Sequence, residues 1–122
     1  MINLAHYRGL RLRGGYVIGR IELTKEPLAD PIGREATGIT RTSGRTLSIF
    51  IRCGLNPREL SVTLYHEVLE AMTLAVTQPP RLMKGFNEGD FERAAQKMHD
   101  QLGQVSPRKL NRMLQLHNFR AR

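Results

Sequence analysis

One segment of the chain is bounded at both ends by residues that fix where a helix begins and stops. Asn56 lies three residues before Glu59 with a proline between them, which is the pattern of an N-cap, a first-turn proline and a capping-box carboxylate. Pro79 and Pro80 end a helix, because proline lacks the amide hydrogen and its ring clashes with the preceding turn. The sequence therefore predicts a helix over 57–77, around which the rest of the chain has to pack.

This predicted helix is apolar over most of its circumference, apart from one narrow polar stripe. Because residues three and four apart share a helix face, the stripe consists of Thr63, His66, Glu67, Glu70, Thr73 and Thr77. A helix that is apolar nearly all round is a buried helix. Burying a charge costs on the order of several kcal/mol unless it is paired or binds a metal ion, so the stripe requires partners.

The chain before this helix has the signals of strands and turns. Residues 1–52 lack long helical periodicity and are rich in glycine and β-branched residues. We expect a strand over 16–23, a loop over 24–32 because it contains two prolines, and a hairpin with arms 36–41 and 46–52. The second arm alternates with a period of two, and its inward face is formed by Leu47, Ile49 and Ile51.

Two more helices are predicted after the double proline. Asn87 and Asp90 form a cap for a helix over 88–102, and Ser106 begins another over 107–118. Their apolar stripes consist of Phe91, Ala94, Ala95, Met98 and Leu102 in the first helix, and Leu110, Met113 and Leu114 in the second. We expect one α+β domain over 1–122, in which a small antiparallel sheet from the N-terminal half packs against the 57–77 helix and the two C-terminal helices.

Charge and cysteine content narrow the function classes. The net charge of +8 is high for 122 residues, and such a bias attracts nucleic acid or another polyanion. Cys53 is the single cysteine, so any metal has to be held by histidine and carboxylate ligands. No stretch approaches the roughly 20 apolar residues of a membrane span, and the start lacks the apolar run of a secretory signal. We therefore expect a cytoplasmic protein without a membrane partner.

The polar stripe contains the residues most able to do chemistry. His66 and Glu70 are four residues apart, a separation at which two side chains of one helix reach the same cation. Glu67 lies beside them, where a carboxylate can accept a proton from a water on that cation. The alternative is a simple His66–Glu70 pair on a solvated helix face, with Glu67 hydrogen-bonded at the surface.

The run Leu47–Ile51 followed by Leu64–Ala71 resembles the edge strand and active-site helix of small zincin-like metallopeptidases of the minimal gluzincin type. The family pattern is H-E-x-x-H, with two histidine ligands and a glutamate general base. The chain also resembles phage and prophage proteins that have an H-E-V-x-E-A helix. The second histidine of the family pattern is Glu70 in this sequence. A carboxylate in that place weakens the activation of water and suits a harder metal such as Mn²⁺ or Fe²⁺ better, although zinc stays the first expectation for the cofactor.

This resemblance implies metal-dependent hydrolysis of a peptide or related amide bond, with Glu67 as the general base and a peptide or protein as substrate. His66 and Glu70 would bind the metal, and gluzincin-type relatives take their third ligand from a glutamate on a following helix. The candidates for that ligand are Glu88 first, Glu92 second and His99 third. The candidates for stabilising an oxyanion are Tyr65 and Arg93.

The competing hypothesis is a non-catalytic basic binding protein, phage-derived, whose partner is nucleic acid or an acidic protein. The segment after Gly103 contains no acidic residue, and its candidate polyanion contacts are Arg108, Lys109 and Arg112. A salt-dependent affinity for nucleic acid that persists in Glu67→Gln would favour this hypothesis, whereas metal-dependent cleavage lost in that variant would favour the hydrolase.

Overall fold

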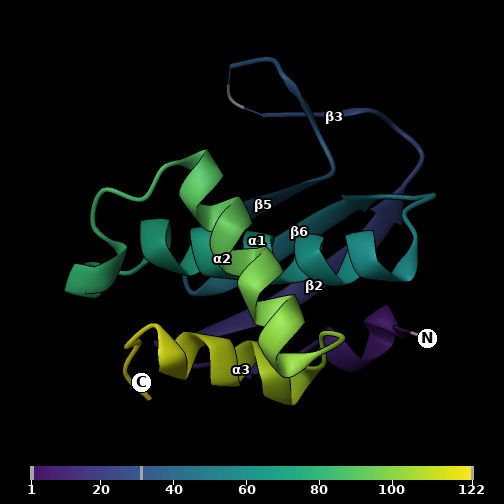
Figure 1. Cartoon of the computed structure of the whole chain (residues 1–122). Coiled ribbons are helices and arrows are strands. Elements are labelled where there is room, and N and C mark those ends of the chain that lie inside the picture. Colours follow the sequence, from purple (N-terminus) through teal and green to yellow (C-terminus); the bar gives the residue numbers. More distant parts are fainter. Residues whose placement is uncertain (1, 31, 122) are drawn as a thin grey trace.

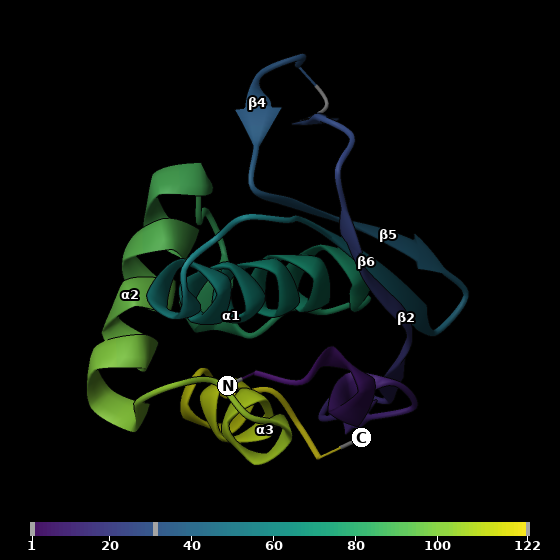
Figure 2. The ribbon, with the colours of Figure 1, turned by 90° about the vertical axis from the view of Figure 1, so that its right-hand side faces the viewer.

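Four strands form the central sheet of the protein, for which a computed structural model describes residues 2–30 and 32–121. The strands are β1 (Arg11–Leu12), β2 (Tyr16–Thr24), β5 (Gly38–Ser43) and β6 (Thr46–Arg52), in the spatial order β1-β2-β6-β5. A smaller sheet pairs β3 (Leu28–Ala29) with β4 (Glu35–Ala36) in an arm that projects from the rest of the fold (Figures 1 and 2). The segment 24–32 therefore contains a short strand where we expected only a loop, and its Pro31 lies outside the described residues.

The α+β class is confirmed, but the expected antiparallel sheet is wrong because the four-stranded sheet is mixed. The pairs β1–β2 and β5–β6 are antiparallel, whereas β2 and β6 run parallel, with Ile21 opposite Ile49. The hairpin is confirmed, and its apolar arm β6 lies between β2 and β5. Burial accounts for this order, because the inward side chains of β6 are fully buried while Arg41–Ser43 of β5 are exposed, as suits an edge.

The three expected helices are present as α1 (Pro57–Ala75), α2 (Glu88–Leu102) and α3 (Pro107–Leu116), with short 3₁₀ helices η1 (Leu4–Tyr7) and η2 (Arg81–Met83). Both capping boxes form as expected. Helix α1 ends two residues early, where the Tyr16 hydroxyl donates to the carbonyl oxygen of Ala75 and the backbone becomes extended at Val76. Helix α3 also ends two residues early, and Asn118 follows it in the left-handed conformation.

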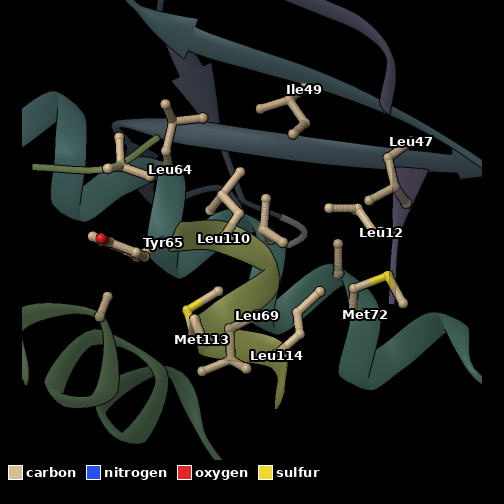
Figure 3. Close-up of a cluster of buried hydrophobic side chains, with 14 of the residues drawn as sticks. Leu12, Leu47, Ile49, Leu64, Tyr65, Leu69, Met72, Leu110, Met113 and Leu114 are labelled. Atoms are coloured by element: carbon tan, nitrogen blue, oxygen red, sulfur yellow. The ribbon is translucent and has the colours of Figure 1, made fainter. Parts of the chain in front are cut away.

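Helix α1 is the centre of the fold. It lies between the sheet on one side and α2 on the other, with α3 packed below (Figure 2). Twelve of its nineteen residues are buried, which confirms the buried helix expected from its apolar circumference. Its side chains Leu64, Leu69 and Met72 meet residues of the sheet and of α3 in one core (Figure 3). Within the described residues, no helix has the length and apolarity to cross a membrane.

Candidate metal centre

The polar stripe of α1 lies under the edge strand β5. Gly38 of β5 brings the two backbones so close that a Cβ added there would lie 2.9 Å from Thr63 Cγ2 and 3.1 Å from Glu67 Cγ. Two residues further along β5, the Thr40 hydroxyl donates to Glu67 Oε1 over 2.9 Å. The strand beside the stripe is thus β5 and not the run Leu47–Ile51, which the sequence had suggested as the edge strand.

His66 is held at the centre of the stripe by carboxylates from two helices. The ring is buried, with 8% of the residue exposed, and its Nδ1 lies 2.8 Å from Glu92 Oε1 of α2. Gln96 donates to the other oxygen of Glu92, so this carboxylate is itself fixed in place. In its neutral form, a histidine whose Nδ1–H donates to a carboxylate presents Nε2 as an acceptor with a lone pair, which is the state that binds metals.

The other ring nitrogen faces two more glutamates. Nε2 of His66 lies 2.9 Å from Glu88 Oε1 and 3.9 Å from Glu70 Oε1. The contact with Glu88 does not have the direction of a hydrogen bond, so Nε2 is the one buried side-chain nitrogen or oxygen in the described part of the chain that lacks a hydrogen-bond partner. One ligand atom each from His66, Glu67 and Glu70 lies within 4.8 Å of the others, and these three residues can hold a metal ion.

Burial and mutual repulsion shift the proton affinities of this cluster. Burial raises the pKa of Glu67, although the hydrogen bond from Thr40 partly opposes it. Burial, followed by the hydrogen bond and the charge of Glu88, raises the pKa of Glu70 to about 8. For His66, burial lowers the pKa, but the hydrogen bond to Glu92 and the nearby carboxylates outweigh it and leave the pKa above its usual value. The cluster of His66 and its glutamates therefore has less positive charge than its carboxylates require.

Among the described residues, His66 is the only basic side chain within ion-pair distance of these glutamates. Among residues 2–30 and 32–121, no lysine or arginine forms an ion pair with Glu67, Glu70, Glu88 or Glu92, although the chain has a net charge of +8. The expected alternative, a pair on a solvated helix face, is wrong because His66 and Glu67 are both buried. A cluster of four carboxylates around one buried histidine requires further protons or a metal ion to balance its charge.

Three residues expected near the site are directed elsewhere. The Tyr65 hydroxyl is buried in the core and donates to the carbonyl oxygen of Gly103 over 3.0 Å, so it does not support an oxyanion (Figure 3). Arg93 is exposed and pairs with Asp90 in the first turns of α2. His99, the third choice of ligand, bonds through Nδ1 to Ser61 Oγ over 2.8 Å and is not brought to His66.

The two glutamate candidates of α2 approach different nitrogens of the His66 ring, and neither belongs to the His66, Glu67 and Glu70 group described above. Glu88, the first choice, meets the free Nε2 of His66, whereas Glu92 meets Nδ1 and so holds the ring in place. Sequence reasoning missed Gly38 and Thr40, which approach Glu67 from a strand 27 residues earlier in the chain. Gly38 lies inside the predicted arm 36–41, and a glycine in that place was the available signal for a close backbone approach.

The expected polyanion contacts on α3 lie away from this centre. Lys109 Nζ donates to the carbonyl oxygen of Gln104, and Arg112 Nη1 donates to Gln115, while Arg108 is exposed. The bond of Arg112 lies within α3, whereas the bond of Lys109 reaches the loop that precedes α3. In comparisons of the whole chain with known proteins, no family model, no curated protein and no solved structure matches it.

Proposed function

We propose that the protein is a zincin-like, metal-dependent hydrolase that cleaves peptide or related amide bonds. The observation that carries this proposal is the state of His66, whose Nδ1 is bonded to Glu92 while its buried Nε2 has no hydrogen-bond partner and faces Glu70 and Glu88. A buried ring nitrogen left without a hydrogen-bond partner is costly. A bound cation would remove that cost and neutralise the carboxylates at the same time.

In this proposal, His66 Nε2, Glu70 and Glu88 hold the metal, and Glu92 positions the imidazole from behind. Ligand atoms about 2.1 Å from a tetrahedral ion are about 3.4 Å apart. The separations of 2.9 Å and 3.9 Å from Nε2 to Glu88 and Glu70 lie on either side of this value. Carboxylate-bonded histidine is the usual arrangement behind a metal ligand, because the carboxylate fixes the tautomer and the ring orientation.

Glu67 has the properties of a general base. When bound, the cation supplies Lewis acidity that polarises a carbonyl group and activates water. Glu67 is 7% exposed and Thr40 occupies its Oε1, which leaves Oε2 as the oxygen that takes up a proton. Because burial raises the pKa of Glu67, this carboxylate binds a proton more readily near neutral pH than an ordinary glutamate does.

Zinc is the proposed metal, with Mn²⁺ and Fe²⁺ as alternatives. Zinc accepts imidazole nitrogens and carboxylate oxygens as ligands, and a catalytic zinc has three protein ligands with its fourth position open. The oxygen-rich set also suits harder ions, because carboxylates favour Mn²⁺ and imidazole is acceptable to Fe²⁺. Metal analysis of the purified protein distinguishes these ions directly.

The edge strand β5 supports an extended peptide as the substrate. Among the described strands, β5 pairs with β6 alone, so its outer side presents unpaired backbone groups immediately beside Glu67. An exposed edge binds an extended chain by adding it as a further strand, with main-chain hydrogen bonds that do not depend on its side chains. A peptide bound in this way would pass directly over the metal ligands and the base.

The test is elemental analysis of tag-free protein in parallel with variants of the site. We expect one equivalent of metal in the native protein and in the control His6→Ala, which removes an exposed histidine, and a loss of that metal in His66→Ala and Glu70→Gln. Glu67→Gln should keep the metal and lose cleavage of a peptide library. A protein that is metal-free and fails to bind added Zn²⁺, Mn²⁺ or Fe²⁺ would refute the proposal.

A further inference from the structure

Carboxylates are distributed very unevenly along this chain. Four stretches contain no aspartate or glutamate, namely 1–21, 36–58, 71–87 and 101–122. The eleven acidic residues all lie between these stretches, and four of them form the candidate metal centre. Where the acid-free stretches meet in space, the positive charge of the protein is therefore concentrated.

The four acid-free stretches meet in a groove beyond the C-terminal end of α1. Two adjoining depressions of about 700 Å³ and about 490 Å³ share Gly14, Val76 and Thr77 in their walls. The segment that follows α1 and the end of the chain after α3 both lie on the left of Figure 1, and they form two sides of this groove. Its cationic lining consists of Arg45, Arg81, Lys84 and Arg120, one or two from each stretch that contributes a cation.

The backbone around two of these cations is fixed. The side chain of Arg13 donates through Nε to the carbonyl oxygen of Phe119 over 3.0 Å, and the Phe119 ring is buried, so the chain is anchored immediately before Arg120. At the other end, the amide of Val17 donates to the carbonyl oxygen of Arg45 over 2.9 Å, and the Arg45 guanidinium lies 5.8 Å from the centre of the Tyr16 ring. The cations thus extend from a held framework and are not on a free tail.

The groove cations are also unneutralised. In the described part of the chain, the ion pairs between basic side chains and carboxylates lie elsewhere, at Arg20, Arg34, Arg52, Arg58 and Arg93. The four groove cations are exposed, and no carboxylate lines either depression among the described residues. An anion that enters the groove therefore replaces no internal partner.

We propose that this groove binds the phosphate backbone of a single-stranded nucleic acid. Arginine forks match phosphate oxygens, and several cations along one groove follow a chain of phosphates. Depressions of this size hold a group about as large as a small molecule, which suits one strand better than the side of a duplex. Because Phe119 is buried, the described groove wall offers cations for phosphates and no exposed aromatic ring for bases. Phosphate contacts carry no sequence information, so we expect binding to be independent of sequence.

This site is separate from the proposed metal centre and from the basic face of α3. None of the residues that line the groove is a proposed metal ligand, and Arg108, Lys109 and Arg112 are absent from the lining. Binding should therefore not require a metal. The two arginines of α3 provide a matched control, because replacing them removes the same charge outside the groove.

The test measures fluorescence anisotropy of a labelled single-stranded DNA of mixed sequence at several salt concentrations. Arg81→Ser/Lys84→Ser should weaken binding roughly tenfold and reduce the slope of log affinity against log salt by about 1.4, which is about 0.7 for each lost phosphate contact. Arg108→Ser/Arg112→Ser should leave the slope unchanged. Binding should persist in EDTA and in His66→Ala.

Four outcomes would overturn this proposal. Equal losses of DNA affinity in the two double variants would mean that net charge alone attracts the strand. Tighter binding to a duplex of the same sequence would exclude a groove for single strands. Displacement of the DNA by polyglutamate at equal charge concentration would identify an acidic protein as the partner. Loss of binding in EDTA would place the strand at the metal centre.

Discussion

Replacing Gly38 by alanine tests the contact between the edge strand and the site. The added Cβ would lie 2.9 Å from Thr63 Cγ2 and 3.1 Å from Glu67 Cγ, both closer than carbon atoms pack without adjustment. Thr63 is buried and β-branched, and Glu67 is buried and bonded to Thr40, so neither moves freely. Overpacking of this kind costs about 1–3 kcal/mol, which exceeds the gain of about 0.4–1 kcal/mol from stiffening the unfolded chain.

We therefore expect Gly38→Ala to lower the free energy of unfolding by about 1–2 kcal/mol, measured by urea denaturation with a two-state fit. Gly89→Ala is the matched control, because it lies in the first turn of α2, where the nearest atoms are 3.4 Å from the new Cβ. In that variant the free energy of unfolding should rise by up to about 1 kcal/mol, because alanine has a higher helix propensity than glycine. If both variants shift stability in the same direction, or if Gly38→Ala is neutral, the close approach of β5 to α1 is refuted.

Three further predictions concern the site and its surroundings. Glu92→Gln should weaken metal affinity by about 10–100-fold in competition titrations, but the variant should still bind one equivalent of metal. A variant that no longer binds this equivalent would show that Glu92 is itself a metal ligand. Since the pKa of Glu70 is about 8, metal binding should release protons, and the affinity measured by calorimetry should rise up to that pH. In the metal-free folded protein Glu70 still holds a proton at a pH at which the unfolded chain has lost it, so the free energy of unfolding should fall as the pH rises toward 8. A free energy of unfolding that does not change over this range would contradict the raised pKa of Glu70. Ser61→Ala leaves His99 Nδ1 and the amide of Val105 without their partner, and should cost about 1–3 kcal/mol in denaturant unfolding; a neutral result would show that water replaces the hydroxyl.

The helices were predictable because their signals are local. Asn56 and Glu59 form the capping box that their spacing predicts, and so do Asn87 and Asp90. The hydrogen bonds of a cap join residues three apart in the chain, so the sequence contains both partners. The end of α1 was less predictable, because it coincides with the bond from Tyr16 to Ala75, 59 residues away.

The sheet shows where local signals fail. The alternation of residues in β6 predicted its buried face correctly. The same alternation does not indicate whether a neighbouring strand runs parallel or antiparallel to β6. The parallel pairing of β2 with β6 depends on which arm of the hairpin enters the sheet, and the more apolar arm does so because more of its surface is buried there. Which arm pairs with β2 depends on the difference in apolar surface between the two arms, so neither arm alone predicts the pairing.

The sequence by itself determined the chemistry that the site can contain, because the helical period places His66 and Glu70 on one face and the apolar remainder of α1 forces that face to be enclosed. It also placed Glu88 and Glu92 on one side of the next helix. Only the tertiary structure decided which ring nitrogen each glutamate meets, that His99 bonds to Ser61, and that β5 lies over Glu67. The physical reason is that helix periodicity sets the direction of a side chain about its own axis, whereas its partner depends on how α2 crosses α1 and on the sheet edge that packs beside it.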